Sequence, residues 1–266
     1  MSRTYSLAYL AFTPLVAPDA IRIAALYGAG AIGVRLLPAA PGGPFDDLIA
    51  NKALMRETKL AMAQTGVSIF DIEIVRIKPE FNVHDYRAFL ETGAELGAKA
   101  ILVAGDDPDQ SRFIANYAAF CEAARPYNMT ADLEFMPWTE VKNARTAMRV
   151  LEAAQQPNAG ILVDSLHVGR SETSNDDIRA IPREWLHYAQ VCDATAGLNF
   201  TLDELIYNAR VERFLPGEGN IDIVGMLAAL PPDLPLSIEI PSEPRKPVLG
   251  VMEWCRLCIE STRRLG

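Results

Sequence analysis

Histidine is scarce in this chain of 266 residues, which contains only His84, His167 and His187. Imidazole is the commonest metal ligand among protein side chains and suits zinc, copper, iron and nickel. Three histidines cannot build a multinuclear centre that consists mainly of imidazole ligands. The composition therefore allows one metal site made chiefly of oxygen ligands, or no metal site.

Positive charge is also in short supply. The chain has 25 Lys and Arg against 34 Asp and Glu, which gives a formal net charge of −9. Proteins that grip nucleic acid do so largely through cationic contacts to phosphates, and these contacts require a basic face. We therefore expect no nucleic-acid partner.

Cysteines and long apolar runs are few. Four cysteines are too sparse for a disulfide scaffold. Cys255 and Cys258 form a CxxC pair, but no second pair completes a zinc site, so we expect both to pack in a core. No apolar stretch approaches the ~18–20 residues of a transmembrane helix, and the N-terminal residues do not resemble a signal peptide. These absences predict a cytoplasmic protein without a membrane partner.

Apolar, β-rich runs recur along the chain and indicate strands. Stretches with helical periodicity lie between them, for example over residues 86–96, 113–121 and 141–151. The expected strands are Tyr5–Phe12, Ala31–Leu37, Val67–Ile77, Ala100–Ala104, Thr130–Phe135, Gly160–Val163, Tyr188–Cys192 and Leu236–Ile240.

Eight strands in 266 residues correspond to roughly 33 residues per strand–helix unit, as a (β/α)₈ barrel of about 250 residues requires. Near-continuous apolar strands are typical of sheets that helices cover on both faces. A doubly wound open sheet is the alternative, but the chain has no GxGxxG fingerprint. We therefore predict the α/β class, with residues 1–266 forming a single TIM-barrel domain.

Polar residues follow or interrupt the last four expected strands, where a parallel barrel places its chemistry. Glu134, Asp164, Gln190 and Glu239 come from consecutive strands and can converge at the barrel mouth. Buried carboxylates are costly unless they are paired or bind a cation. Three carboxylates and an amide oxygen suit one divalent ion, with Mn²⁺ or Mg²⁺ favoured and Zn²⁺ or Co²⁺ as alternatives. Isolated strand-end residues bonded to neighbouring loops are the competing interpretation.

Other polar and aromatic residues are expected near the same mouth. His167, three residues after Asp164, can reach a substrate or be an ordinary loop histidine. Trp138 can stack on a sugar face or cover the barrel edge. Arg35 and Arg76 can hold a phosphate or carboxylate, or form ordinary ion pairs with acids such as Glu73 or Asp106.

The segments Asp132–Phe135, Asp164–His167, Gln190–Ala194 and Arg213–Asp222, together with Glu239–Pro241, resemble the sugar phosphate isomerase/epimerase family. These are the xylose isomerase-like TIM barrels, which include endonuclease IV. The resemblance is sharpest over residues 130–242. Gln190 and the Pro216–Gly219 segment are most similar to the hydroxypyruvate isomerase branch.

The resemblance implies a metal ion held by Glu134, Asp164, Gln190 and Glu239, with Glu134 and Glu239 also serving as acid and base. It implies that His167 binds substrate beside the metal and that Arg213 is an anion clamp or a loop anchor. The scarcity of histidine excludes the trinuclear zinc chemistry of endonuclease IV.

The expected function is a metal-dependent isomerase or epimerase of a small sugar or polyhydroxy carbonyl compound. The reaction would proceed by proton abstraction next to a carbonyl, through an enediolate. A dehydratase of the 3-dehydroshikimate or inosose type shares that first step and is the alternative function. A non-catalytic sugar-binding barrel is the third alternative. Barrels of this kind often pair, so a homo-oligomer stays open beside a monomer.

Overall fold

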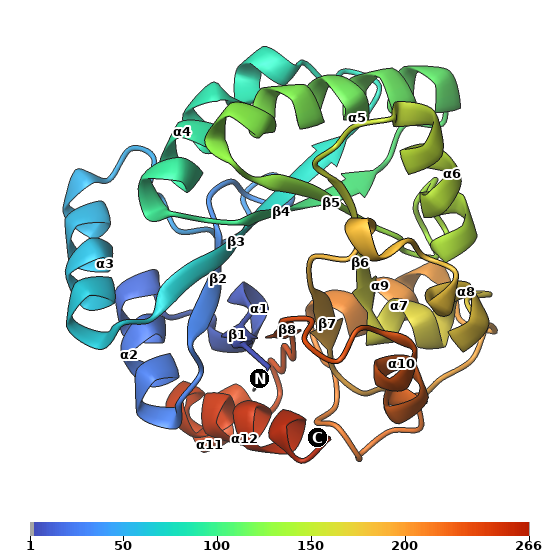
Figure 1. Ribbon diagram of the computed structural model, residues 1–266. Coiled ribbons are helices and arrows are strands. Elements are labelled where there is room, and N and C mark those ends of the chain that lie inside the picture. The colour runs from blue at the N-terminus through green and yellow to red at the C-terminus, as the bar shows by residue number, and fades with distance from the viewer. Residues whose placement is uncertain (1–2, 266) are drawn as a thin grey trace.

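The computed structural model describes residues 3–265, which form a closed barrel of eight parallel strands. Figure 1 shows the strands at the centre and the helices around them. The strands are β1 Tyr5–Leu7, β2 Ala31–Arg35, β3 Ser68–Ile77, β4 Ala100–Gly105, β5 Thr130–Glu134, β6 Ala159–Asp164, β7 Ala189–Val191 and β8 Leu236–Ile238. The predicted (β/α)₈ TIM barrel is confirmed.

Helices follow the strands and cover the outside of the barrel. The α-helices are α1 Tyr9–Phe12, α2 Ala17–Tyr27, α3 Lys52–Thr65, α4 Arg87–Leu96, α5 Gln110–Ala124, α6 Ala144–Ala154, α7 Ser165–Arg170, α8 Asn175–Arg179, α9 Leu202–Arg210, α10 Ile223–Ala229, α11 Lys246–Leu249 and α12 Val251–Arg263. Three short 3₁₀ helices, at Val83–Tyr86, Arg125–Tyr127 and Arg183–Trp185, complete the described set.

Local sequence signals set the helix ends. The Asn51 side chain accepts hydrogen bonds from the backbone of Ala53 and Leu54 and so caps the start of α3. The helix stops at Gly66, whose φ of 77° is the left-handed conformation that glycine adopts without strain. Asn51 and Gly66 therefore set the two ends of α3, and the chain is free to begin β3 after Gly66.

The layer between the strands and the helices that cover them consists of buried apolar side chains. Every residue of β2, β4 and β6 is buried, as expected for strands covered on both faces. Cys255 and Cys258 are completely buried on α12, which confirms their predicted core position. No helix in the span 3–265 is long and apolar enough to cross a membrane.

The first expected strand is too long. β1 ends at Leu7, and Tyr9–Phe12 forms the helix α1 instead of continuing the strand. Tyr9 and Phe12 lie three residues apart, both are buried, and their rings meet edge to face. A short apolar run is compatible with a strand or with a helix, and the residues after Leu7 form a helix.

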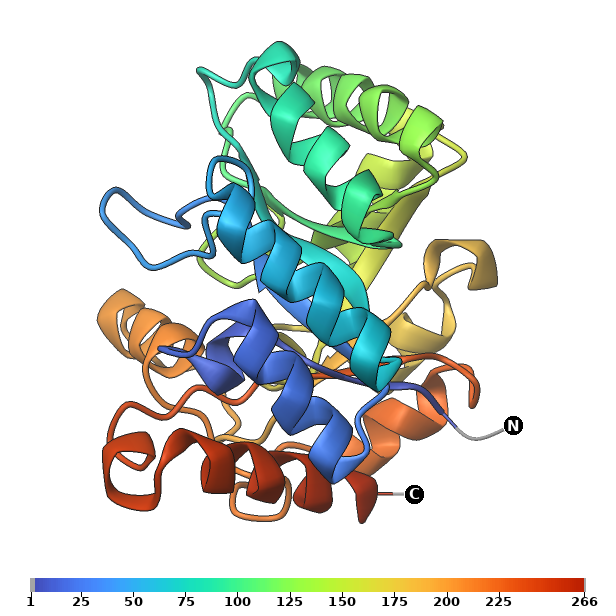
Figure 2. The ribbon, with the colours of Figure 1, turned by 90° about the vertical axis from the view of Figure 1, so that its left-hand side faces the viewer.

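Closure joins the two ends of the sheet. β1 pairs with β8 in parallel, with Ser6 opposite Ser237, and with β2 on its other side. All eight strands therefore end on the same side of the ring, as Figure 1 allows the reader to follow. The loop after β2, coloured mid-blue, and α9, coloured orange, project from that same side in Figure 2.

Candidate active site and metal centre

The four strand-end residues singled out by the sequence come from β5 to β8. Glu134 is the last residue of β5, Asp164 is the last of β6, and Glu239 directly follows β8. Gln190 is the middle residue of β7, opposite Asp164 on one side and Ser237 on the other. All four side chains are buried, with exposures of 0–4%.

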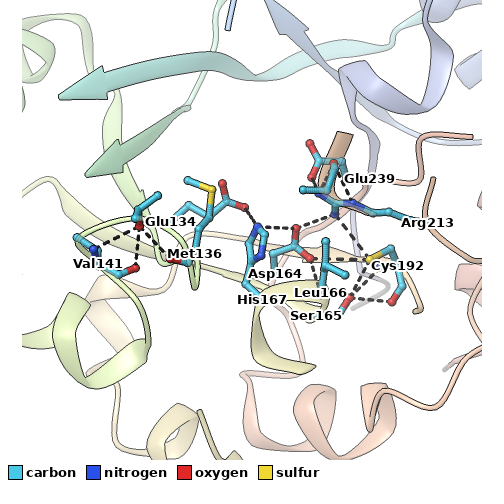
Figure 3. Close-up of polar contacts among 12 residues, drawn as sticks. Glu134, Met136, Val141, Asp164, Ser165, Leu166, His167, Cys192, Arg213 and Glu239 are labelled. Carbon is cyan, nitrogen blue, oxygen red and sulfur yellow. Dashed lines mark hydrogen bonds and ion pairs between the residues drawn. The ribbon is translucent and has the colours of Figure 1, made fainter. Parts of the chain in front are cut away.

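Glu134, Asp164 and His167 form a compact cluster. His167 Nε2 lies 3.3 Å from Glu134 Oε1 and 3.7 Å from Asp164 Oδ2. Figure 3 shows the His167 ring between the two carboxylates. His167 belongs to α7, and Asp164 Oδ1 caps this helix by accepting a hydrogen bond of 2.8 Å from the Leu166 backbone. The cap thus fixes His167 relative to Asp164.

Arg213 continues this row of charges towards β8. Its Nη1 donates to Asp164 Oδ2 at 2.7 Å, and its Nη2 lies 2.7 Å from Glu239 Oε2 (Figure 3). The Ala209 carbonyl accepts further hydrogen bonds from Nε and Nη2. Burial favours neutral Arg213, but Asp164 and Glu239 outweigh it and raise the pKa of Arg213 well above its usual value. Arg213 is therefore a permanent buried cation.

This guanidinium changes one argument made from the sequence. Three clustered carboxylates require a compensating cation, and Arg213 supplies one such charge to Asp164 and Glu239. Burial raises the pKa of Asp164, but the ion pair with Arg213 outweighs it and holds that pKa below its usual value. Repulsion among the carboxylates alone is thus a weaker reason to expect a metal than the sequence suggested.

The donor set nevertheless fits a metal ion. Glu134, Asp164 and His167 each offer a ligand atom, and these atoms lie within 4.8 Å of one another. Among the described residues, both amide atoms of Gln190 are buried without a hydrogen-bond partner, and the buried Glu134 Oε1 makes no hydrogen bond, although His167 Nε2 lies 3.3 Å away. Buried polar atoms without partners are uncommon in folded proteins, and here they belong to two of the predicted ligands. Carboxylate, amide and imidazole donors together suit a divalent ion.

The structure brings some of the predicted site residues into direct contact and separates others. Glu134 and Asp164 share the cluster, whereas Glu239 reaches Asp164 through Arg213. His167, predicted to contact substrate, takes a place in the metal-competent cluster. Trp138 packs edge to face on His167, with ring centroids 5.1 Å apart.

A cavity of about 210 Å³ opens over these residues. Glu134, His167, Arg213 and Glu239 contribute to its wall, and Trp138 lines it as well. Carboxylate, imidazole and guanidinium groups therefore line one cavity that can receive a small molecule.

Asp193 is the residue that sequence reasoning missed. It appeared only within a segment of the family resemblance, but its buried carboxylate accepts hydrogen bonds from the backbone of Gly217, Gly219 and Ile221. A Cβ on Gly219 would lie 2.3 Å from the Ala194 carbonyl oxygen, so only glycine fits this close approach. Asp193 thus folds the segment after Arg213 back onto the barrel.

Comparison with known protein families identifies one match. The family described as the xylose isomerase-like TIM barrel matches residues 21–258. No curated protein sequence matches this chain significantly.

Solved structures share the fold at low identity. A zinc-bound crystal structure of the IolI protein is 14% identical, with a TM-score of 0.79 over 98% of this chain and 97% of that one. D-Allulose 3-epimerase from Methylomonas sp., in complex with D-allulose, is 16% identical, with a TM-score of 0.72 over 100% and 98%. The probable 3-DHS dehydratase AsbF from Bacillus anthracis is 15% identical, with a TM-score of 0.73 over 95% and 97%.

A fusion of a xylose isomerase-like TIM barrel with 4-hydroxyphenylpyruvate dioxygenase is 20% identical, with a TM-score of 0.77. The match covers 91% of this chain but spans only 39% of the fusion protein. At these identities the likeness shows the fold.

Proposed function

Because this chain belongs to the xylose isomerase-like TIM barrel family, we propose that it is a metal-dependent isomerase or epimerase of a small sugar or polyhydroxy carbonyl compound. The buried row of side chains from Glu134 through His167 and Asp164 to Arg213 and Glu239 carries the proposal. Four of these five residues line a single cavity.

In this proposal the metal ligands are Glu134, Asp164, Gln190 and Glu239, and His167 is a further donor beside them. A divalent ion there, Mn²⁺ or Mg²⁺ in preference to Zn²⁺ or Co²⁺, would supply a Lewis acid that stabilises negative charge on substrate oxygens. The partnerless buried atoms of Glu134 and Gln190 support this assignment.

Glu134 and Glu239 are the proposed acid and base. One removes the proton from the carbon next to the substrate carbonyl, and the other returns a proton to the resulting enediolate. Return to the same carbon inverts it and gives an epimer, whereas return to the neighbouring carbon exchanges aldose and ketose. Both glutamates are buried at the cavity wall. Burial supports these roles because the exclusion of bulk water protects a reactive intermediate from side reactions.

His167, Trp138 and Arg213 are the proposed substrate-binding residues. The Trp138 and His167 rings meet at the cavity wall and can cover one face of a sugar. Arg213 lines the same space, and two carboxylates and the Ala209 carbonyl fix the direction of its guanidinium.

A dehydratase is the second candidate, and the structural likeness to the probable 3-DHS dehydratase favours keeping it. A dehydratase uses the same first proton abstraction but then expels a β-hydroxyl group. Product mass separates the two reactions, since loss of water marks the dehydratase and an unchanged mass marks the isomerase.

The test uses deuterium exchange. The protein is incubated in D₂O with Mn²⁺ and a panel of ketoses, aldoses and hydroxy-keto acids, and NMR follows deuterium at the carbon next to the carbonyl. We expect exchange with at least one compound, and we expect Glu134→Gln and Glu239→Gln each to slow it by about 10²-fold or more. Glu152→Gln, at an exposed position on α6, is the matched control and should leave the rate unchanged.

Two outcomes would contradict the proposal. Exchange that survives both glutamate substitutions would remove Glu134 and Glu239 from the chemistry. Binding of sugars by the metal-loaded protein without any exchange would favour a non-catalytic sugar-binding barrel.

A further inference from the structure

Three arginines from separate elements line the cavity that also holds the candidate site. Arg35 ends β2, Arg76 lies near the end of β3, and Arg210 ends α9. The chain as a whole carries a net charge of −9. Burial together with the like charges of Arg76 and Arg35 lowers the pKa of Arg210. The three guanidinium groups therefore repel one another across a shared space.

Two of these arginines already have carboxylate partners. Arg35 lies 3.1 Å from Glu73, and Arg76 makes two contacts to Asp106, at 2.7 and 3.0 Å. Ordinary ion pairing, one of the two alternatives open from the sequence, thus holds for both residues. These pairs fix the direction of each guanidinium without blocking every donor.

Arg35 keeps an unsatisfied donor inside the cavity wall. The residue is only 7% exposed, and its guanidinium lies over the Tyr9 ring at 4.7 Å. Its Nε is buried and has no hydrogen-bond partner among the described residues. A buried charged donor without a partner is costly, so this position is suited to a group that arrives from the cavity.

Arg210 has no partner of either kind. Over residues 3–265 it makes no ion pair and no side-chain hydrogen bond, although it lines the cavity. Glu73 and Asp106 pair with Arg35 and Arg76, so Arg210 is the one of these three arginines without an ion-pair partner over residues 3–265. Arg213 differs, because Asp164 and Glu239 already neutralise it.

We propose that the substrate of this site carries an anionic group, a carboxylate or a phosphate, which is seated between Arg35, Arg76 and Arg210. This inference rests on the proposed function, since it places the reacting carbonyl of the same molecule near Glu134 and Glu239. Both sets of residues line one cavity, so a small sugar acid or sugar phosphate can span them. Guanidinium groups bind the oxygens of carboxylates and phosphates through paired donors, which matches this arrangement.

The test compares three polyols that lack an aldehyde or ketone and so cannot undergo the proposed reaction: sorbitol, sorbitol 6-phosphate and gluconate. Isothermal titration calorimetry measures their binding to the full chain loaded with Mn²⁺. We expect at least one of the two anions to bind about 10-fold or more tightly than sorbitol. Preference for sorbitol 6-phosphate would identify a phosphate, and preference for gluconate would identify a carboxylate.

Substitution of the unpaired arginine supplies the control. Arg210→Gln removes an exposed side chain without a partner, so the fold should be retained, and the preference for the anion should fall about 10-fold. Arg22→Gln, which removes a guanidinium from an exposed pair with Asp19 on α2, should leave the preference unchanged. Sorbitol binding as tightly as both anions, binding of neither anion, or an unaltered preference in Arg210→Gln would each overturn the inference.

The two proposals fail separately. Anion binding that depends on Arg210, without deuterium exchange on any compound, would keep the anion site and remove the proposed reaction. Exchange restricted to neutral sugars, with no preference for an anion, would keep the reaction and remove the anion site.

Discussion

At the scale of single residues, Arg213 is the unusual feature of the site. It is 2% exposed, and both of its ion-pair partners are buried as well. Buried ion pairs contribute little net stability compared with apolar packing, but removal of one partner leaves an uncompensated charge. The main role of Arg213 in stability is thus to neutralise two buried carboxylates, rather than to add favourable contact energy of its own.

Arg213→Gln should therefore destabilise the metal-free protein by about 3 kcal/mol, because Asp164 and Glu239 lose their shared cation. Added Mn²⁺ should raise the melting temperature of this variant more than that of the wild type, since the ion replaces the missing charge. Differential scanning fluorimetry with EDTA and then with Mn²⁺ measures both effects. Arg179→Gln, at an exposed ion pair with Asp176, is the control. Equal metal responses in Arg213→Gln and the wild type would refute this explanation.

At the scale of elements, the segment between α9 and α10 depends on Asp193. This carboxylate accepts four backbone hydrogen bonds, from Ala194, Gly217, Gly219 and Ile221. Backbone N–H groups that lose a buried acceptor cost about 1–3 kcal/mol each. The position of Arg213, at the start of this segment, follows from the same hydrogen bonds.

Asp193→Asn should loosen this segment, because the amide replaces one acceptor oxygen with a donor that faces backbone N–H groups. We expect faster hydrogen exchange over residues 214–221 and a loss of about 2 kcal/mol in the free energy of unfolding. Asp109→Asn is the control, since Asp109 caps α5, away from this segment, and asparagine caps equally well. Unchanged exchange in Asp193→Asn, measured by mass spectrometry, would show that other contacts hold the segment.

The sequence predicted the elements better than the contacts between them. Apolar runs located all eight strands, and the error at β1 arose because Tyr9–Phe12 satisfies a helical period as well. Strand ends predicted that Glu134 and Asp164 lie together. The ion pair between Arg213 and Asp164 joins residues 49 positions apart through an irregular segment, so no period or spacing encodes it. The predicted roles of Glu134, Asp164, Gln190 and Glu239 as metal ligands stay predictions.

At the scale of the whole molecule, the pH dependence of stability depends on a buried carboxyl group. Burial raises the pKa of Asp46, in the loop after β2, to about 7. The unfolded chain loses this proton near pH 4, whereas the folded protein keeps it until about pH 7. Stability should consequently fall as the pH rises through this interval. The prediction that residues 1–266 form a single domain stays a prediction.

Asp46→Asn should remove this part of the pH dependence. We expect the variant to gain roughly 2–4 kcal/mol relative to the wild type at pH 8, and little or nothing at pH 4. Urea unfolding across this pH range measures the difference. Asp47→Asn, at the neighbouring position, should track the wild type at every pH. Parallel pH profiles for Asp46→Asn and the wild type would contradict the assignment.

The pairing of β1 with β8 also sets an order of events during synthesis. Residues 5–7 are translated before their partner at residues 236–238, with the other six strands between them. Asp164 is made well before Arg213, so a nascent chain carries a buried-site carboxylate whose neutralising guanidinium has not yet been translated. The ring and its charge balance are therefore completed together, once β8 and Glu239 have been translated.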